Sequence, residues 1–189
     1  ALGTVAALGL SRPHMPFKAV LMAILISPMI VPLIITAAGM FFFYSKMGLT
    51  HTYLGLILAH TALGTPFVVI TVTATLTGFD TNLIRASQSL GADTMRTFFK
   101  VIMPLILPGV ISGGLFAFIT SFDEVVVVMF IGSVEQITIP KQMWAGLRQE
   151  TSPVILCMAT CLVALSIGLL TTVEMLRRRS ERLRGIKQR

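Results

Sequence analysis

Few residues of this chain could carry chemistry. His60 interrupts a long apolar run, Asp123 and Glu124 form an adjacent acidic pair, and Cys157 and Cys161 stand four residues apart. Imidazole, carboxylate and thiolate groups are the usual metal ligands of proteins, and the first two also act as general acids and bases. No histidine or carboxylate lies near the cysteines in sequence, so we interpret them as small packing residues. We expect no metal site and no catalytic set.

Nucleotide chemistry is not expected within the chain either. The phosphate-binding pattern G-x-x-x-x-G-K-[ST] does not occur, so any ATP that drives this protein would have to be hydrolysed by a separate subunit. The sequence thus predicts a protein that is not an enzyme and that needs no cofactor.

Each polar residue within or beside an apolar run can be interpreted either as a structural residue or as a residue that contacts a solute. An intramembrane histidine is costly, so His60 should face inward, more often to bond a neighbouring helix than to bind a solute. Asp123 and Glu124 could meet a cationic solute, or they could pair with Lys141 or Arg148 or lie in interfacial water. Because adjacent helical residues point ~100° apart, at most one of the two carboxylates should face a pathway.

The elements that must position these groups are membrane helices. Apolar residues make up 54% of the 189 residues, charged residues only 12%, and mean hydropathy is +0.86. Four runs without Asp, Glu, Lys or Arg are about long enough to cross a bilayer. They predict an all-α, polytopic transmembrane bundle with spans at Val20–Phe43, Tyr53–Leu76, Leu105–Phe122 and Val154–Val173.

Prolines predict a bend or break in the first span, and small residues predict close packing of the third. Pro28 and Pro32 make the first span either a kinked helix or a broken segment that lines a pathway, and we favour the second. Small residues at the start of the third span predict close packing against another helix. They are Gly109, Ser112, Gly113 and Gly114.

The distribution of basic residues predicts the orientation. Of 15 Lys and Arg, seven lie in Arg177–Arg189, two flank the first span and three lie in the polar passage after the second. Twelve on one side against three on the other is the asymmetry expected of cytoplasmic loops. We therefore predict a membrane domain at 1–176 and a basic cytoplasmic tail at 177–189 that contacts anionic lipid, not nucleic acid.

The polar passage Leu83–Pro108 predicts two short helices joined by a tight corner. Asp80, Thr81 or Asn82 could cap the first helix, Gly91 suits the left-handed residue after it, and Asp93 could cap the second. Pro104 and Pro108 should interrupt or kink the second helix. The helical spacing predicts apolar stripes that pack on membrane helices, Leu83, Ala86, Ser87 and Leu90 in the first and Met95, Phe98, Phe99 and Ile102 in the second. It leaves Arg85, Gln88, Arg96 and Lys100 to water or a partner.

This passage resembles the signature loop of permease subunits of type I ABC importers, which reads E-A-A, three residues, G, nine residues, I-x-L-P. Here the matching positions are Arg85-Ala86-Ser87, Gly91 and Val101-Ile102-Met103-Pro104, with each spacing kept. Arg85 replaces the usual glutamate, and Ser87, Val101 and Met103 are milder departures. The resemblance implies a cytoplasmic coupling loop at about 80–104 that docks on an ATPase subunit. Its residues would include Arg85, Ala86, Ser87, Gly91, Ala92, Asp93 and Pro104.

Shorter matches place the chain nearest the spermidine/putrescine branch of that family. They are S-P-x-x-V-P from Ser27, A-H-x-x-x-x-x-P-F from Ala59, and S-F-D-E from Ser121. We expect a solute pathway that includes Asp123, Glu124 and His60, and the last motif favours Asp123 over Glu124 within the acidic pair. The outer segment with Trp144 and Arg148 would face a solute-binding protein.

The resemblance also implies partners and a mechanism. The partners would be ABC ATPase subunits, a second permease that is identical or homologous, and a periplasmic or extracellular solute-binding protein. The subunit would sit in the bacterial inner membrane, with one or more spans before residue 1, and would import a polyamine by alternating access. The alternatives are another solute, such as iron, thiamine, a sugar or an amino acid, or an ATP-independent channel, which would not need a loop of this spacing.

Overall fold

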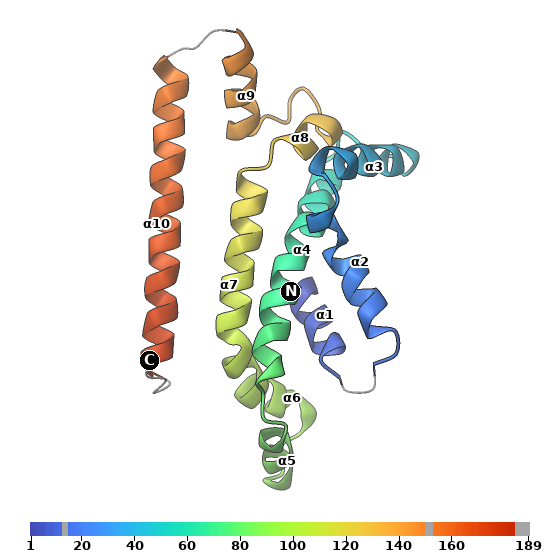
Figure 1. Cartoon of the computed structure of the whole chain (residues 1–189), viewed down its shortest axis with the longest axis vertical. Coiled ribbons are helices and arrows are strands. Elements are labelled where there is room, and N and C mark those ends of the chain that lie inside the picture. Colours follow the sequence, from blue (N-terminus) through green and yellow to red (C-terminus); the bar gives the residue numbers. More distant parts are fainter. Residues whose placement is uncertain (13–14, 150–152, 184–189) are drawn as a thin grey trace.

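A computed structural model of the chain describes residues 1–12, 15–149 and 153–183, and every regular element in these ranges is a helix (Figure 1). This confirms the predicted all-α fold. The elements, in order, are α1 (Leu2–Leu10), α2 (Lys18–Ile30), α3 (Leu33–Lys46), α4 (Tyr53–Thr77), α5 (Asn82–Ser89), α6 (Thr94–Thr97), the π-helical turn η1 (Phe98–Ile102), α7 (Met103–Phe122), α8 (Val126–Ile131), α9 (Ile139–Gln149) and α10 (Pro153–Leu183).

Three of the four predicted spans are continuous helices. The spans are Tyr53–Thr77, Thr94–Phe122 and Pro153–Thr172, and each is long and apolar enough to cross a membrane. The first predicted span is instead two helices, α2 and α3, that meet at 108°. Val31 is extended there (φ −71°, ψ 134°) because a residue before proline avoids the helical region, and Pro32 then starts α3. The break in the preferred interpretation is confirmed, and its lining of a pathway stays a prediction.

The third span is longer than the predicted one because it begins earlier in the sequence, and it ends at Phe122 as predicted. Helix α6 continues through the π turn η1 into α7, which gives one helix of 29 residues, Thr94–Phe122. The helix continues through Pro104 and Pro108, so of the two predicted outcomes an interruption is wrong and a kink stays a prediction. A proline ring clashes with the carbonyl four residues earlier, and the wider π turn just before α7 displaces that carbonyl.

Helices α4 and α7 pack so closely that the contact requires glycine, as the small residues predicted. A Cβ on Gly113 would lie 2.7 Å from Val68 Cα, and one on Gly109 would lie 3.0 Å from the Thr71 carbonyl oxygen. Thr71 Oγ1 lies 2.9 Å from the carbonyl oxygen of Gly109 and can donate to it across the contact. Because lipid offers no hydrophobic drive for helix association, this close packing and interhelical bond must hold the pair together.

A buried apolar cluster fixes the short helix α8 against α3 and α4. Its fully buried members include Ala37, Ala59, Val127 and Ile131. The His51 backbone N–H also donates to the Ile131 carbonyl at 2.8 Å, which ties the α3–α4 turn to the end of α8.

Helix α10 stands apart from the other helices and meets the rest of the chain through α7 and α9 (Figure 1). None of its membrane-crossing window is buried. Cys157 and Cys161 are both exposed, so they do not pack within the described part of this chain. The helix runs on to Leu183, past the predicted start of a tail at 177, and 184–189 lie outside the described residues.

The elements divide between two ends of the molecule. Helices α5 and α6 lie at the lower end of Figure 1, where the last turns of α10 also lie, and α3, α8 and α9 lie at the upper end. The two candidate sites described next lie at these opposite ends.

Candidate functional site

The first candidate site is the corner between α5 and α6. Gly91 has φ +82°, the left-handed conformation predicted from the sequence. Its N–H donates to Gln88 O at 2.9 Å, and the N–H of Ala92 donates to Ser87 O at 3.1 Å. This pair of bonds is the Schellman motif, in which glycine is favoured because a Cβ is strained at positive φ.

Side chains lock the second half of the corner. Asp93 Oδ1 accepts from the N–H of Arg96 at 2.8 Å, so the predicted cap of the second helix is confirmed. Ser87 and Thr97 join their hydroxyls across the corner at 3.0 Å, and Thr97 is buried. At the start of α5, Thr81 is the N-cap residue without a side-chain bond, and Asp80 Oδ1 accepts from Asn82 N instead.

The outer surface of the corner mixes charge and apolar area. Arg85, Gln88, Arg96 and Lys100 are exposed, as predicted. The predicted packing of the apolar stripe of α5 on membrane helices is wrong, since α5 projects beyond them and leaves Leu90 89% exposed. Of the remaining loop residues, Ala86, Gly91, Asp93 and Pro104 are exposed, and Ala92 is half-buried.

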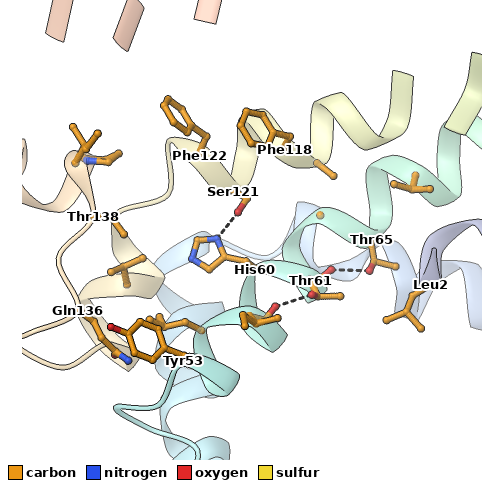
Figure 2. A pocket seen from close by; sticks show the side chains of 18 of the residues that line it. Leu2, Tyr53, His60, Thr61, Thr65, Phe118, Ser121, Phe122, Gln136 and Thr138 are labelled. Atoms are coloured by element: carbon orange, nitrogen blue, oxygen red, sulfur yellow. Dashed lines mark hydrogen bonds between the residues drawn. The ribbon is translucent and has the colours of Figure 1, made fainter. Parts of the chain in front are cut away.

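The second candidate site is a cavity of about 930 Å³ at the opposite end (Figure 2). Its walls come from the first turns of α4, the last turns of α7, the start of α1 and the segment 135–140 that precedes and begins α9. The lining is mostly apolar, with aromatic side chains from both long helices. The residues that contribute polar or aromatic groups are Tyr53, His60, Thr61, Thr65, Phe118, Ser121, Phe122, Glu135, Gln136 and Thr138.

His60 links the two long helices at this cavity. Its Nδ1 lies 2.8 Å from Ser121 Oγ, so α4 and α7 share a hydrogen bond at a half-buried position (Figure 2). The interpretation of His60 as a residue that bonds a neighbouring helix is confirmed. The same side chain also lines the cavity, so contact between His60 and a solute is geometrically possible as well.

The structure separates the two acidic residues that follow Ser121. Asp123 is exposed at the end of α7, whereas Glu124 is buried and its Oε1 accepts from the N–H of Val127 at 2.7 Å. Neither residue is among those that line the cavity. Glu124 therefore caps the first turn of α8, and Asp123 is the acid of the pair that meets solvent.

The side chain of Lys141 donates hydrogen bonds to the backbone of the α8–α9 connection. Its Nζ donates to Ser133 O at 2.9 Å and to Gln136 O at 3.1 Å, so its ammonium has partners other than Glu124. Ser133 and Gln136 also bond each other reciprocally, from Ser133 N to Gln136 Oε1 and from Gln136 N to Ser133 Oγ. These bonds hold the segment that walls the cavity in one conformation.

Helix α9 carries the two residues assigned to the outer surface. It begins at Ile139, with Pro140 in its first turn, where proline is tolerated. Trp144 is 47% exposed on it. Arg148 lies in the same helix, but its side chain is outside the described part of the chain.

Sequence reasoning missed most of the cavity. Tyr53, Glu135 and Gln136 line it, and nothing in the local sequence marks Tyr53 or Gln136. The one available signal was that Glu135 is a carboxylate in an outer segment with few charges.

Known transport proteins resemble this chain over most of its length. The sequence profile of a family described as "Binding-protein-dependent transport system inner membrane component" matches residues 1–182. The chain is similar to the spermidine/putrescine transport system permease protein PotC of Haemophilus influenzae, with 29% identity over 95% of this chain and 70% of that protein. It is 28% identical to PotC of Escherichia coli K12 over 94% of this chain and 67% of that protein. The putrescine transport system permease protein PotI of the same strain is also 28% identical, over 86% of this chain and 60% of that protein.

The same fold is found among solved structures. A chain of the MetNI methionine ABC transporter, in an inward-facing conformation, matches with a TM-score of 0.74 over 95% of this chain and 86% of that one. Sequence identity is 20%, so this likeness concerns the fold alone.

Proposed function

The chain belongs to the family of inner-membrane components of binding-protein-dependent transport systems, and from this premise we propose that it is the permease subunit of an ATP-driven importer of polyamines. It is a multi-pass membrane protein, and its described residues include three helices long and apolar enough to cross a membrane and one bent pair, α2 and α3. We infer that it works with ABC ATPase subunits, a second permease and an external solute-binding protein.

The corner at Gly91 carries this proposal. A left-handed glycine, a Schellman motif and the Ser87–Thr97 bond hold two short helices in a fixed relation beyond the bundle. A rigid projection with exposed cationic and apolar side chains is suited to docking in a cleft of another protein. A passive channel has no need of such an element, which favours the ATP-driven importer.

The preference for polyamines rests on the relatives and on chemistry. PotC is named as a permease of a spermidine/putrescine transport system and PotI as one of a putrescine transport system. Asp123 places an exposed carboxylate beside the apolar span at the end opposite the corner, where a cationic solute would arrive. Alternating access would then carry the solute past the broken α2–α3 segment and the α4–α7 pair.

ATP hydrolysis by the reconstituted complex tests the function. The permease pair, the ATPase subunits and the binding protein are placed in nanodiscs and screened with spermidine, 1,4-diaminobutane, thiamine, ferric ion, a sugar and an amino acid. We expect the amines alone to stimulate hydrolysis. Stimulation by another solute would retain the class and replace the substrate, and no stimulation by any solute would refute the proposal.

The proposed orientation predicts accessibility. We place the corner and the end of α10 in the cytoplasm and α9 outside, because twelve of 15 cationic residues gather toward the first side. Single cysteines at Ser180 and Gln142, with Cys157 and Cys161 replaced, should react with an impermeant thiol reagent only from the cytoplasm and only from outside, respectively. Labelling of both from one side, or the reverse pattern, would contradict this topology.

We propose that Asp123 draws cationic solute to the outer mouth. Asp123→Asn keeps the size and removes the charge, so uptake of spermidine at limiting concentration should fall about two- to fivefold, the scale of an exposed charge of ~0.3–1 kcal/mol. Complex recovery and basal ATP hydrolysis should not change. The effect should shrink in high salt, since exposed charges are screened. Unaltered concentration dependence, or failed assembly, would make Asp123 a structural residue.

A further inference from the structure

We propose that the cavity between α4, α7 and segment 135–140 is a binding site for an alkylammonium group, and that Glu135 is its anionic ligand. The inference rests on the proposed function and deepens it, because it names the residue that would recognise the solute within the membrane domain. Glu135 lies outside the short motifs named in the sequence analysis.

Charge distinguishes Glu135 from the other residues of the cavity wall. Among the described residues that line the cavity, Glu135 is the one acidic side chain, and no lysine or arginine joins it. The basic side chain nearest in sequence, Lys141, donates to the carbonyl oxygens of Ser133 and Gln136. The carboxylate of Glu135 has no protein partner in the described part of the chain. Within the described residues, the cavity wall therefore carries one negative charge without a partner, on a side chain that is exposed.

The other polar groups of the lining are already engaged within the protein. His60 and Ser121 bond each other, Thr61 Oγ1 donates to Ile57 O at 2.6 Å, and Thr65 Oγ1 donates to Thr61 O at 2.6 Å (Figure 2). Their remaining lone pairs can accept hydrogen bonds. An ammonium group, which carries three donors and no acceptor, matches a wall that offers acceptors and one anion.

The apolar part of the wall suits the rest of such a ligand. Tyr53 rises from α4, and Phe118 and Phe122 stack on α7 with ring centroids 5.6 Å apart (Figure 2). Aromatic faces attract cations, and apolar walls accept the methylene groups between amines. The cavity volume of about 930 Å³ falls in the usual range for small-molecule sites.

Glu135 is also held in place before any ligand arrives. The reciprocal Ser133–Gln136 bonds bracket it, and Lys141 fastens the same segment to the first turn of α9. A carboxylate on a fixed segment loses little conformational freedom on binding, which favours recognition.

Thiol labelling within the cavity tests this site without depending on transport. Thr61→Cys, in a chain with Cys157→Ser and Cys161→Ser, places one thiol on the cavity wall of the purified complex in nanodiscs. Two methanethiosulfonates of similar size are compared, one with a trimethylammonium group and one with a sulfonate. We expect the cationic reagent to react faster relative to the anionic one, and Glu135→Gln to lower that ratio about three- to fivefold, because the lost charge attracts one reagent and repels the other by about twofold each. Added 1,4-diaminobutane should slow labelling, and Glu135→Gln should raise the concentration required about tenfold.

A relocated charge supplies the matched control. Val134 is 90% exposed and does not line the cavity, so Val134→Glu combined with Glu135→Gln keeps the charge of the segment but moves it out of the site. This double variant should behave like Glu135→Gln alone. Recovery of the wild-type ratio would show that surface charge is sufficient and would overturn the proposal, as would an unchanged ratio in Glu135→Gln. If labelling responds as expected but no amine stimulates ATP hydrolysis, the ammonium site stands and the proposed transport function fails.

Discussion

Replacing Gly113 with leucine is expected to prevent assembly of the transporter. A Cβ at this position already meets Val68 Cα at 2.7 Å, and backbone atoms cannot rotate away as a side chain can. Overpacking of a tight contact costs about 1–3 kcal/mol even where side chains can shift, so separation of α4 from α7 should follow. The variant should still insert, because its hydropathy is unchanged or higher. Recovery of the ATPase subunits with the tagged permease should drop at least tenfold.

The neighbouring glycine provides the control for this prediction. Gly114 lies on the same helix, is exposed, and has no atom within 4 Å of the point where a Cβ would lie. Gly114→Leu changes composition and helix propensity in the same way, and it should assemble normally. Equal recovery of the two variants would show that the close α4–α7 contact does not hold the domain together.

Replacing Gly91 with valine is expected to uncouple the permease from ATP hydrolysis while leaving the membrane helices intact. Gly91 has φ +82°, a conformation that costs an ordinary L-residue roughly 1–2 kcal/mol and is a genuine outlier for a β-branched one. The two Schellman bonds would break, and α5 would lose its fixed angle to α6. Copurified ATPase and amine-stimulated hydrolysis should both fall at least tenfold, with normal amounts of permease in the membrane.

Gly48 separates this effect from general backbone strain. It has φ +67° and open space around it, but it lies between α3 and α4 at the other end of the molecule. Gly48→Val introduces similar strain and should leave ATPase binding unchanged. Uncoupling by Gly48→Val to the same degree, or wild-type coupling by Gly91→Val, would refute the role assigned to the corner.

Features set by neighbouring residues could be predicted from the sequence. Gly91 and Asp93 take the expected conformation and cap because both depend on hydrogen bonds within a few residues. The break before Pro32 follows from the same kind of local rule. Pro104 is the exception. Proline usually ends a helix because its ring clashes with the carbonyl four residues earlier, but here that carbonyl belongs to a π turn and the helix continues.

Features set by distant parts of the chain could not be predicted. Glu135 shares a cavity wall with residues of α4 and α7 only because of where the α8–α9 connection lies in the fold, and no sequence periodicity records that. The exposure of Leu90 likewise depends on how far α5 projects beyond the bundle. Glu124 and Asp123 are adjacent in sequence, yet the start of α8 buries one and leaves the other in solvent.

Accumulation of labelled 1,4-diaminobutane by proteoliposomes tests the central claim most directly. The vesicles contain the permease pair and its ATPase subunits, with loaded binding protein outside and either ATP or a non-hydrolysable analogue inside. We predict accumulation above the external concentration with ATP and none with the analogue, and loss of accumulation in Gly91→Val. Equilibration of the amine at the same rate with the analogue would mean a passive channel and would contradict an ATP-coupled permease.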